Sequence, residues 1–368
     1  MERPIFQPVG TPVDELDTPA LVVDLDLMER NIQTYHGYIA ASDATVRPVV
    51  TSHLSPQVAR RQLAAPRSRG VAVTTIGEAE VFASAGFADI LLANQVVTAS
   101  KIRRLCALAN QASISVAVDS ADNVAQLSRS AVAAGVELGA LVEVEAGMGR
   151  CGVSPDAEAV ALARSVNAAE GLRFQGIMAS VPGPSGDSPE SHTQQTIRNL
   201  QIALDARDLM ESAGLKVAEV SVGGAHCAAA VASLPGITEV RAGRYPLMDV
   251  RLREHLPELS LAAMVLATVI SRPVAELAVL DAGHKATGPD MGRPVLQGVA
   301  GGFAARFSAE HGIVELESEA EGMLAPGDKA RLAPWELASC VNQYDYIRAV
   351  RGGRLEGYWP LSARGRFA

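Results

Sequence analysis

The run Leu138-Gly-Ala-Leu-Val-Glu-Val-Glu145, followed by Ala-Gly-Met-Gly-Arg150, is the stretch that most clearly indicates the fold. It is almost continuously apolar, as expected of a strand buried on both faces of a parallel sheet. Glycines and charged residues follow it directly, where the strand passes into a loop. This stretch therefore indicates one βα unit, with its functional groups expected at the carboxyl end of the strand.

Seven further runs of the same kind lie on either side of it, separated by longer Ala/Leu/Arg segments of helical character. A capping signal at Asp119–Asp122 with a later Gly135, and the segment 98–109, support helices between them. Eight parallel strands close naturally into a (β/α)8 barrel. The eight expected strands are Val46–Thr51, Val71–Thr75, Ile90–Asn94, Ile114–Asp119, Leu138–Glu145, Phe174–Val181, Glu219–Gly223 and Thr238–Gly243.

The sequence pattern changes after about Val250, where glycines and prolines interrupt short strands and no long helical segment follows. This pattern predicts a C-terminal all-β domain. We expect an N-terminal segment at 1–20 that packs on the β domain, a barrel at 21–255 and the β domain itself at 256–368.

Composition favours a protein that acts on small molecules. The 368 residues carry a formal net charge of −9, which argues against nucleic acid or anionic membranes as partners. No CxxC pair and no apolar leader are visible, and the apolar run at 259–270 is too short to span a membrane. We therefore expect a cytoplasmic protein.

Polar and glycine residues stand at the carboxyl ends of the expected strands, where a βα barrel places its functional groups. The turn from Ser221 to Ala225 can present backbone N–H groups to a phosphate or carboxylate, or can simply be a tight connection. The strand-end residues are Thr51, Ser52, His53, Thr75, Asn94, Gln95, Asp119, Glu145 through Arg150, Ser180, Gly223, Gly224, His226, Arg244 and Tyr245.

Several motifs, in order and with similar spacing from about Asp17 to the C-terminus, resemble the D-threonine aldolase and D-serine dehydratase family. This resemblance implies the alanine-racemase-like, fold-type III architecture, a barrel that binds pyridoxal phosphate (PLP) followed by a β domain, and a homodimer. The motifs are Asp17-Thr-Pro-Ala-Leu-Val-Val-Asp24, Gly77-Glu-Ala-Glu80, Ala93-Asn-Gln-Val-Val97, Glu143-Val-Glu-Ala-Gly-Met-Gly-Arg-Cys-Gly152, Asp281-Ala-Gly-His-Lys285, Glu310-His-Gly312 and Trp359-Pro-Leu-Ser-Ala-Arg-Gly365.

Three positions depart from the family pattern. Where the resemblance places the Schiff-base lysine, the run Arg47-Pro-Val-Val-Thr-Ser-His-Leu54 has Thr51, and a hydroxyl cannot form an imine. Glu336 and Ala338 stand where the family has its metal pair, and a single carboxylate is a poor zinc site. Met178-Ala-Ser-Val-Pro-Gly183 lacks the family's tyrosine. We therefore do not expect covalent PLP, whereas a bound metal stays open.

The catalytic candidates are His53 and His226 for proton transfer, Glu336 as an acid, base or metal ligand, and Thr51 at the lysine position. Each also has a structural interpretation, as a hydrogen-bonded, capping or solvated side chain. The binding candidates are Arg150 for an anion or a ring nitrogen, Arg244 for a substrate carboxylate or a surface ion pair, and Ser221, Gly223, Gly224 and Tyr245 as cavity lining.

Three functions agree with these residues. The first is a lyase, dehydratase or isomerase that acts on a small hydroxy or amino acid without a PLP-lysine imine. The second is a catalytically inactive family member that binds a ligand or regulates. The third is a PLP-dependent amino-acid lyase with a displaced lysine, for which Lys101, Lys216, Lys285 and Lys329 are the candidates.

Overall fold

Strand pairing organises the chain into two sheets. This computed structural model describes residues 6–183, 189–288 and 292–368. The barrel unit comprises Tyr35–Thr51, Ala59–Gly243 and Gly365–Ala368. The sheet unit comprises the described part of Met1–Thr34 together with Ser52–Val58 and Arg244–Arg364.

The barrel unit holds eight strands in the order β2-β9-β8-β7-β6-β5-β4-β3, and all of its pairings are parallel. Isolated bridges from Val46 to Ser68 and from Val49 to Ala72 bring the two ends of this sheet together. The expected barrel is therefore confirmed. Its strands are β2 (Thr45–Pro48), β3 (Val71–Val73), β4 (Asp89–Leu92), β5 (Ser113–Val118), β6 (Leu138–Glu145), β7 (Leu172–Ser180), β8 (Glu219–Gly223) and β9 (Glu239–Ala242).

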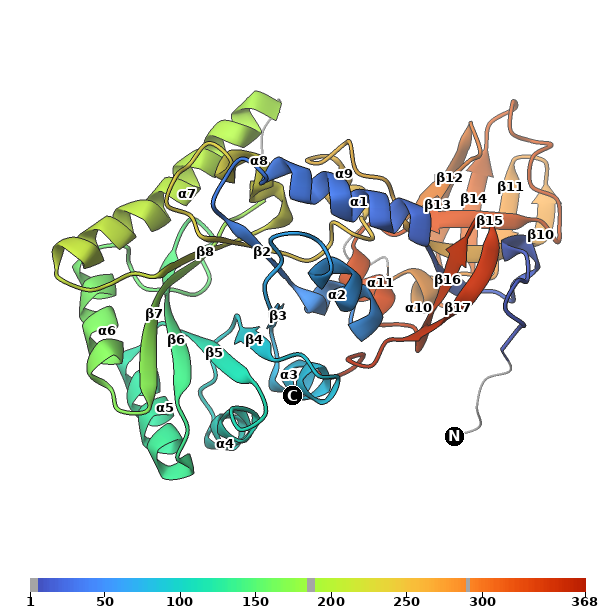
Figure 1. The fold of residues 1–368 in the computed structure, drawn as a ribbon. Helices are drawn as coiled ribbons and strands as arrows, with labels where there is room; N and C mark the ends of the chain where they lie inside the picture. The colour runs from blue at the N-terminus through green and yellow to red at the C-terminus, as the bar shows by residue number, and fades with distance from the viewer. Residues whose placement is uncertain (1–5, 184–188, 289–291) are drawn as a thin grey trace. The chain divides into compact units, whose positions relative to one another are not determined.

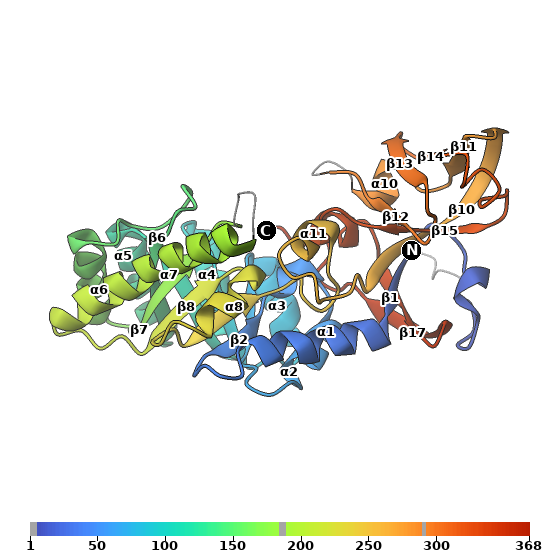
Figure 2. The same cartoon turned by 90° about the horizontal axis from the view of Figure 1, so that it is seen from above.

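Helices α4 to α7 lie along the outside of these strands (Figure 1). The second view shows α7 crossing over β7 and β8 on the same outer side (Figure 2). The helical elements of the barrel unit are α3 (Ile76–Ser84), α4 (Ala99–Leu108), α5 (Ala121–Ala134), α6 (Ala157–Ala168), α7 (Pro189–Ser212), η3 (Ala225–Cys227) and α8 (Ala228–Val231). Three elements include residues of both units, namely α1 (Leu25–Tyr38), η2 (Val50–Ser52) and α2 (Pro56–Leu63).

Local signals in the sequence fix the ends of these helices. The hydroxyl of Ser120 accepts a hydrogen bond from the backbone N–H of Asn123, which caps α5, and Gly135 ends it with a φ of 66°. Thr98 caps α4 in the same way. Both caps satisfy N–H groups that the first helical turn leaves without partners.

The inside of the barrel combines an apolar layer with buried charges. The layer is made of one side chain from each of five neighbouring strands, Ala72, Leu91, Ala117, Leu141 and Met178. On β2, the guanidinium of Arg47 bonds to Glu239 at 2.7 Å and to Asp89 at 2.8 Å. Arg47 and Glu239 are almost completely buried, so water cannot stabilise the charge of either side chain if the other is removed.

Substitution of Arg47 by Met should therefore lower the free energy of unfolding by about 3–5 kcal/mol, because it leaves the buried carboxylate of Glu239 unpaired. Arg173→Met, which breaks an exposed ion pair with Glu137, should cost no more than about 1 kcal/mol. Urea unfolding of the two variants measures both values. Equal losses would contradict the structural importance of the buried pair.

The sheet unit contains nine strands, with β1 between β10 and β16. The pairing of β1 is antiparallel to β10 and parallel to β16, so segments from both ends of the sequence share one sheet. Its core includes Leu16, Ala20, Val22, Leu266, Val350 and Leu355. This unit confirms the expected C-terminal all-β architecture.

The strands of the sheet unit are β1 (Ala20–Asp24), β10 (Ala263–Val274), β11 (Leu277–Leu280), β12 (Val295–Gln297), β13 (Gly302–Phe307), β14 (Gly312–Leu316), β15 (Lys329–Ala333), β16 (Tyr346–Arg351) and β17 (Arg354–Pro360). Its short helices are η1 (Val13–Glu15), α9 (Val250–Arg253), α10 (His284–Thr287) and α11 (Leu337–Val341). None of the helices in the described ranges combines the length and the apolarity that a membrane crossing needs.

Three expected strands end at least two residues earlier than the sequence indicates, β3 at Val73 instead of Thr75, β4 at Leu92 instead of Asn94, and β2 by the largest margin. The first barrel strand ends at Pro48 instead of Thr51, and Val50–Ser52 form a 3-10 turn. Proline has no N–H to donate to a strand ladder, which weakens the pairing at this point. Thr51 therefore lies in a turn after the strand.

Candidate active site

The carboxyl ends of the barrel strands gather polar side chains, as the topology requires. We call this group, which belongs entirely to the barrel unit, the barrel mouth. It consists of Thr51 after β2, Thr74 after β3 with Glu78 on α3, Gln95 after β4, Asp119 after β5, Glu143 on β6, Arg150 in the loop after it, Ser180 on β7, Gly223, Gly224 and His226 after β8, and Arg241 on β9.

Thr51 is joined to a buried carboxyl group. Its hydroxyl donates a hydrogen bond of 2.9 Å to Oε2 of Glu78 and lies 3.3 Å from the hydroxyl of Thr74. Glu78 is held in the first turn of α3, where the capping hydroxyl of Thr75 accepts a hydrogen bond from its backbone N–H. The position is therefore built around a hydroxyl group.

Burial raises the pKa of Glu78, although hydrogen bonds from Thr74, Thr51 and the backbone of Thr75 act in the opposite direction. Glu78 is only 4% exposed, so water cannot stabilise its charged form well. An acid of this kind keeps its proton to a higher pH than an exposed glutamate.

Glu143 is the second buried acid of the barrel mouth. Burial raises its pKa, while a hydrogen bond from Gln95 and the charges of Arg241 and Arg150 act against that shift. The amide of Gln95 donates to Oε2 of Glu143, and the hydroxyl of Ser180 lies 3.5 Å from Oε1. Arg150 itself is exposed on the loop.

A buried arginine supports the turn formed by Gly223 and Gly224 at the end of β8, which we call the glycine turn. Arg241 donates hydrogen bonds of 2.8 Å to both the carbonyl and the hydroxyl of Ser221, and one of 2.9 Å to the carbonyl of Ala179. Burial lowers the pKa of Arg241 to about 10. A Cβ at Gly223 would lie 2.6 Å from this guanidinium, which explains the glycine. Ser221 is fully buried, and its hydroxyl also donates to Glu239, so its role is structural support of the turn.

His226 is half-buried in the 3-10 turn that follows Gly224. Its Nε2 lies 3.6 Å from the sulfur of Cys227, and burial raises the pKa of that thiol to about 12. Cys227 therefore stays protonated and cannot act as a nucleophile near neutral pH. A Cβ at Gly224 would lie 2.4 Å from the imidazole ring, so this glycine makes room for His226.

The other sequence-predicted residues belong to the sheet unit, where they take part in local structure. His53 is fully buried, and its Nδ1 accepts a hydrogen bond of 3.2 Å from the backbone of Ser55. Tyr245 is also fully buried. The guanidinium of Arg244 pairs at 3.0 Å with Asp249, a fully buried carboxylate. The carboxylate of Glu336 caps α11 through Ser339 at 2.8 Å.

Comparison with known proteins then decides the family. Residues 23–248 match the alanine racemase N-terminal domain, and residues 262–350 match the putative serine dehydratase domain. D-threonine aldolase of Arthrobacter sp. is 36% identical over 98% of this chain and 96% of its own length. The chain belongs to the D-threonine aldolase and D-serine dehydratase family.

Two further relatives agree with this family assignment. 3-Hydroxy-D-aspartate aldolase of Paracoccus denitrificans (strain Pd 1222) is 34% identical over 97% of this chain and 94% of its own length. The crystal structure of D-threonine aldolase from Filomicrobium marinum superimposes with a TM-score of 0.92 at 32% identity, covering 98% of this chain and 99% of that one. By their names these family members are aldolases, so the family is one of lyases.

The family resemblance implies PLP, and covalent attachment of PLP needs a lysine amine. Lys285 forms an exposed ion pair with Glu310, and Lys329 donates to Thr268, both within the sheet unit. Lys101 lies in the first turn of α4, a helix on the outside of the barrel (Figure 1), and Lys216 precedes β8 at the opposite end from Thr51. The barrel mouth, with the hydroxyl of Thr51 bonded to Glu78, does not fit a covalently held PLP.

A metal site needs several ligating side chains close together. Across residues 6–183, 189–288 and 292–368, no group of three or more His, Cys, Asp or Glu side chains is arranged to hold a metal ion. Glu336, which the sequence suggests as a metal ligand, therefore belongs to no such group in the described part of the chain. Its carboxylate instead accepts a hydrogen bond in the cap of α11.

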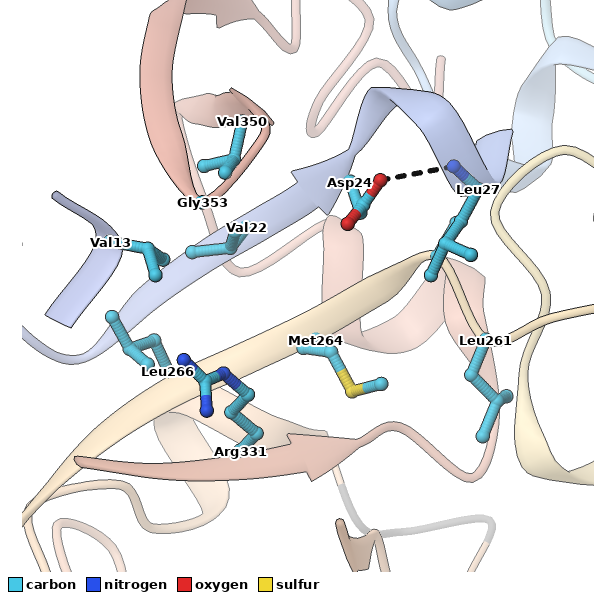
Figure 3. A pocket seen from close by; sticks show the side chains of 11 residues that line it. Val13, Val22, Asp24, Leu27, Leu261, Met264, Leu266, Arg331, Val350 and Gly353 are labelled. Carbon is cyan, nitrogen blue, oxygen red and sulfur yellow. Dashed lines mark hydrogen bonds between the residues drawn. The ribbon is translucent and has the colours of Figure 1, made fainter. Parts of the chain in front are cut away.

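A separate cavity of about 300 Å³ lies within the sheet unit (Figure 3). Its walls are mainly apolar, with Val22, Met264 and Leu266 among them, and Asp24 and Arg331 are its charged residues. Asp24 caps α1 through Leu27, as the dashed line in Figure 3 marks. None of the sequence-predicted site residues lines this cavity.

Three residues of the site, Glu78, Glu143 and Arg241, are not among those predicted from the sequence. A usable signal was present, since Glu143 and Arg241 interrupt runs that are otherwise apolar. A charged residue in a buried strand must have a polar partner inside the barrel. Glu78 stands three residues after Thr75, which is the spacing of a helix capping box.

The raised pKa of Glu78 predicts a dependence of stability on pH. The folded chain keeps this proton at pH values where the unfolded chain, with a pKa of 4.5, has lost it, so the contribution is present at low pH and is lost as pH rises. The Tm of Glu78→Gln relative to wild type should therefore increase as pH rises above 4.5.

Glu80 on the same helix provides a control with the opposite sign. A hydrogen bond from Arg104 lowers its pKa, so its contribution is lost as pH falls. The Tm of Glu80→Gln relative to wild type should therefore decrease as pH rises toward 4.5 and level off above it, where the relative Tm of Glu78→Gln increases. Thermal melts in a series of buffers test both variants, and parallel curves for the two would contradict the assignment.

Proposed function

We propose that this chain is a lyase-type enzyme that acts on a small hydroxy or amino acid without forming a lysine imine. The observation that carries the proposal is the hydrogen bond from Thr51 to Glu78 at the position where the family resemblance places a lysine. The surrounding barrel mouth keeps acids, a histidine and an arginine, which are the groups that proton transfer and anion binding need.

We assign proton transfer from carbon to His226, because an imidazole can both accept and release a proton and this one is half-buried in the turn that follows β8. Arg150, exposed on its loop, is assigned to the substrate carboxylate, whose negative charge increases as the neighbouring carbon loses its proton. His53, Arg244, Tyr245 and Glu336 are assigned supporting roles, since burial or a structural hydrogen bond already occupies each of them.

A ligand-binding protein without turnover is the second candidate. Two observations favour it: Arg244 forms an ion pair with Asp249, and Glu336 caps α11. Neither side chain is then available to bind or activate a substrate. A displaced-lysine PLP enzyme ranks below both, because Lys285 and its partner Glu310 are 71% and 61% exposed. The homodimer that the family resemblance implies stays a prediction.

Incubation without added PLP should show turnover of at least one member of a panel of small β-hydroxy acids and β-hydroxy amino acids in both configurations, followed by proton NMR. His226→Ala should lower kcat by roughly 10²–10⁴-fold, because a positioned acid or base contributes about that much. His311→Ala, an exposed histidine of the sheet unit, is the matched control and should keep wild-type turnover.

Wild-type turnover by His226→Ala would contradict the assigned base. If wild type leaves every substrate unchanged but calorimetry shows that it binds one of them, the ligand-binding candidate replaces the lyase.

Thr51→Lys tests whether position 51 corresponds to the lysine of the family. The new amine would lie beside Glu78, and we expect this variant to gain an imine absorbance with added PLP that borohydride fixes at residue 51. Thr98→Lys, at the cap of α4, is the control and should gain no fixed label at its new lysine. Equal labelling of the two variants would contradict the correspondence.

A further inference from the structure

The cavity of about 300 Å³ in the sheet unit is built on one face of neighbouring strands. Side chains at alternate positions of a strand lie on the same face of a sheet, and residues directly opposite each other on paired strands share that face. Val22 is paired with Met264, and Leu266 is paired with Arg331. The cavity-lining residues of this face are Val22 and Asp24 on β1, Met264 and Leu266 on β10, Arg331 on β15 and Val350 on β16.

The apolar floor of the cavity belongs to the core of the sheet unit. Val22, Leu266 and Val350 are among the buried residues of that core. Arg331 and Gly353 also line the cavity and are exposed, so they mark the side on which it meets solvent. A volume of about 300 Å³ lies at the lower end of the range for small-molecule sites. The cavity is therefore a well-supported pocket that a small molecule can enter.

Asp24 brings a carboxylate without a counter-charge into this cavity. Its Oδ1 accepts a hydrogen bond of 3.0 Å from the backbone N–H of Leu27, which caps α1. Within the described ranges of the chain, its carboxylate forms no other hydrogen bond and no ion pair. Figure 3 shows the second oxygen of Asp24 pointing away from Leu27, toward the side of the cavity where Met264 lies. This half-buried carboxylate thus has one oxygen open to a ligand.

The helix cap alone does not require a charge at Asp24. Asparagine caps helices about as well as aspartate, because either side-chain oxygen can accept the hydrogen bond from the backbone. A carboxylate that faces apolar walls costs free energy unless a cation pairs with it. Asp24 is therefore suited to an ammonium group that a ligand supplies.

Arg331 provides a positive charge at a different level of the sheet. Its Nη2 lies 2.7 Å from Oδ1 of Asp14, and the other N–H groups of its guanidinium bond to none of the described residues. The backbone N–H of Asp24 donates to Ala262, whereas Arg331 is paired with Leu266, four residues further along the chain. Four residues of antiparallel strand span about 14 Å. A ligand that reaches both side chains must therefore carry its own two charges at opposite ends.

We propose that this cavity binds an ω-amino acid, a chain-like molecule with an ammonium group at one end, a carboxylate at the other and an apolar chain between them. The ammonium group donates to Asp24, the methylene chain covers Met264 and Leu266, and the carboxylate accepts from Arg331. The site lies wholly within the sheet unit. It is independent of the proposed lyase function, whose residues belong to the barrel unit.

Isothermal titration calorimetry of the wild-type chain with 4-aminobutanoate, 6-aminohexanoate and 8-aminooctanoate tests the site. We expect saturable binding, with a Kd that falls by about fourfold for each additional CH₂ group that is buried. 2-Aminooctanoate is an isomer of 8-aminooctanoate with both charges at one end, and it should bind at least about tenfold more weakly. Absence of saturable binding at millimolar concentrations of all three probes, or equal affinity for the two isomers, would overturn the proposal.

Asp24→Asn keeps the cap of α1 and removes the charge. We expect the Kd for 8-aminooctanoate to rise by roughly 10–100-fold, with a small change in Tm. Asp156→Asn is the matched control, because Asp156 also caps a helix, α6 of the barrel unit, and it should keep the wild-type Kd. Wild-type affinity in Asp24→Asn would overturn the assignment of the ammonium site.

Arg331→Gln is a second variant, and it leaves the cap of α1 untouched. It should raise the Kd for 8-aminooctanoate but not that for octylamine, which has no carboxylate. Arg306→Gln, exposed on β13, is its control and should bind both probes as wild type does. Arg150→Gln should also keep wild-type affinity, and a loss there would place the probe in the barrel mouth and overturn the proposal.

Discussion

The hydrogen bond from the hydroxyl of Thr51 to the buried carboxyl of Glu78 is the interaction on which the proposed chemistry depends. A lysine amine at this position would be a cation and would form an ion pair with the carboxylate of Glu78. A hydroxyl instead leaves the acid neutral over a wider pH range. Threonine in place of lysine at position 51 thus removes the nucleophilic amine and also favours the protonated form of Glu78.

The barrel interior keeps this arrangement in place through buried charges that satisfy one another. Arg47 joins Glu239 and Asp89, and Arg241 supports the glycine turn through Ser221. Replacing such groups singly leaves an unpaired charge or donor in the buried interior. The mouth of the barrel is therefore supported from below by buried charges that bond to one another, whereas Arg150 is exposed on its loop.

The sequence predicted the architecture well, because buried parallel strands are recognisable from their apolar runs, and β6 and β8 have the expected bounds. It predicted the site less completely. Glu336 and Arg244 look free in a sequence, whereas the folded chain engages them with a helix cap and with Asp249. Such contacts join residues through tertiary structure and leave no mark in local spacing, and the same holds for the bond between Thr51 and Glu78.

The central claim, that no lysine amine serves the barrel mouth, is tested most directly by the intact mass of the wild-type protein after incubation with PLP and reduction with borohydride. Denaturation before mass spectrometry removes any cofactor that is not covalently held. At a single equivalent of PLP, we predict the unmodified mass of the chain. A stoichiometric pyridoxyl adduct that maps to one of the four lysines would contradict the account.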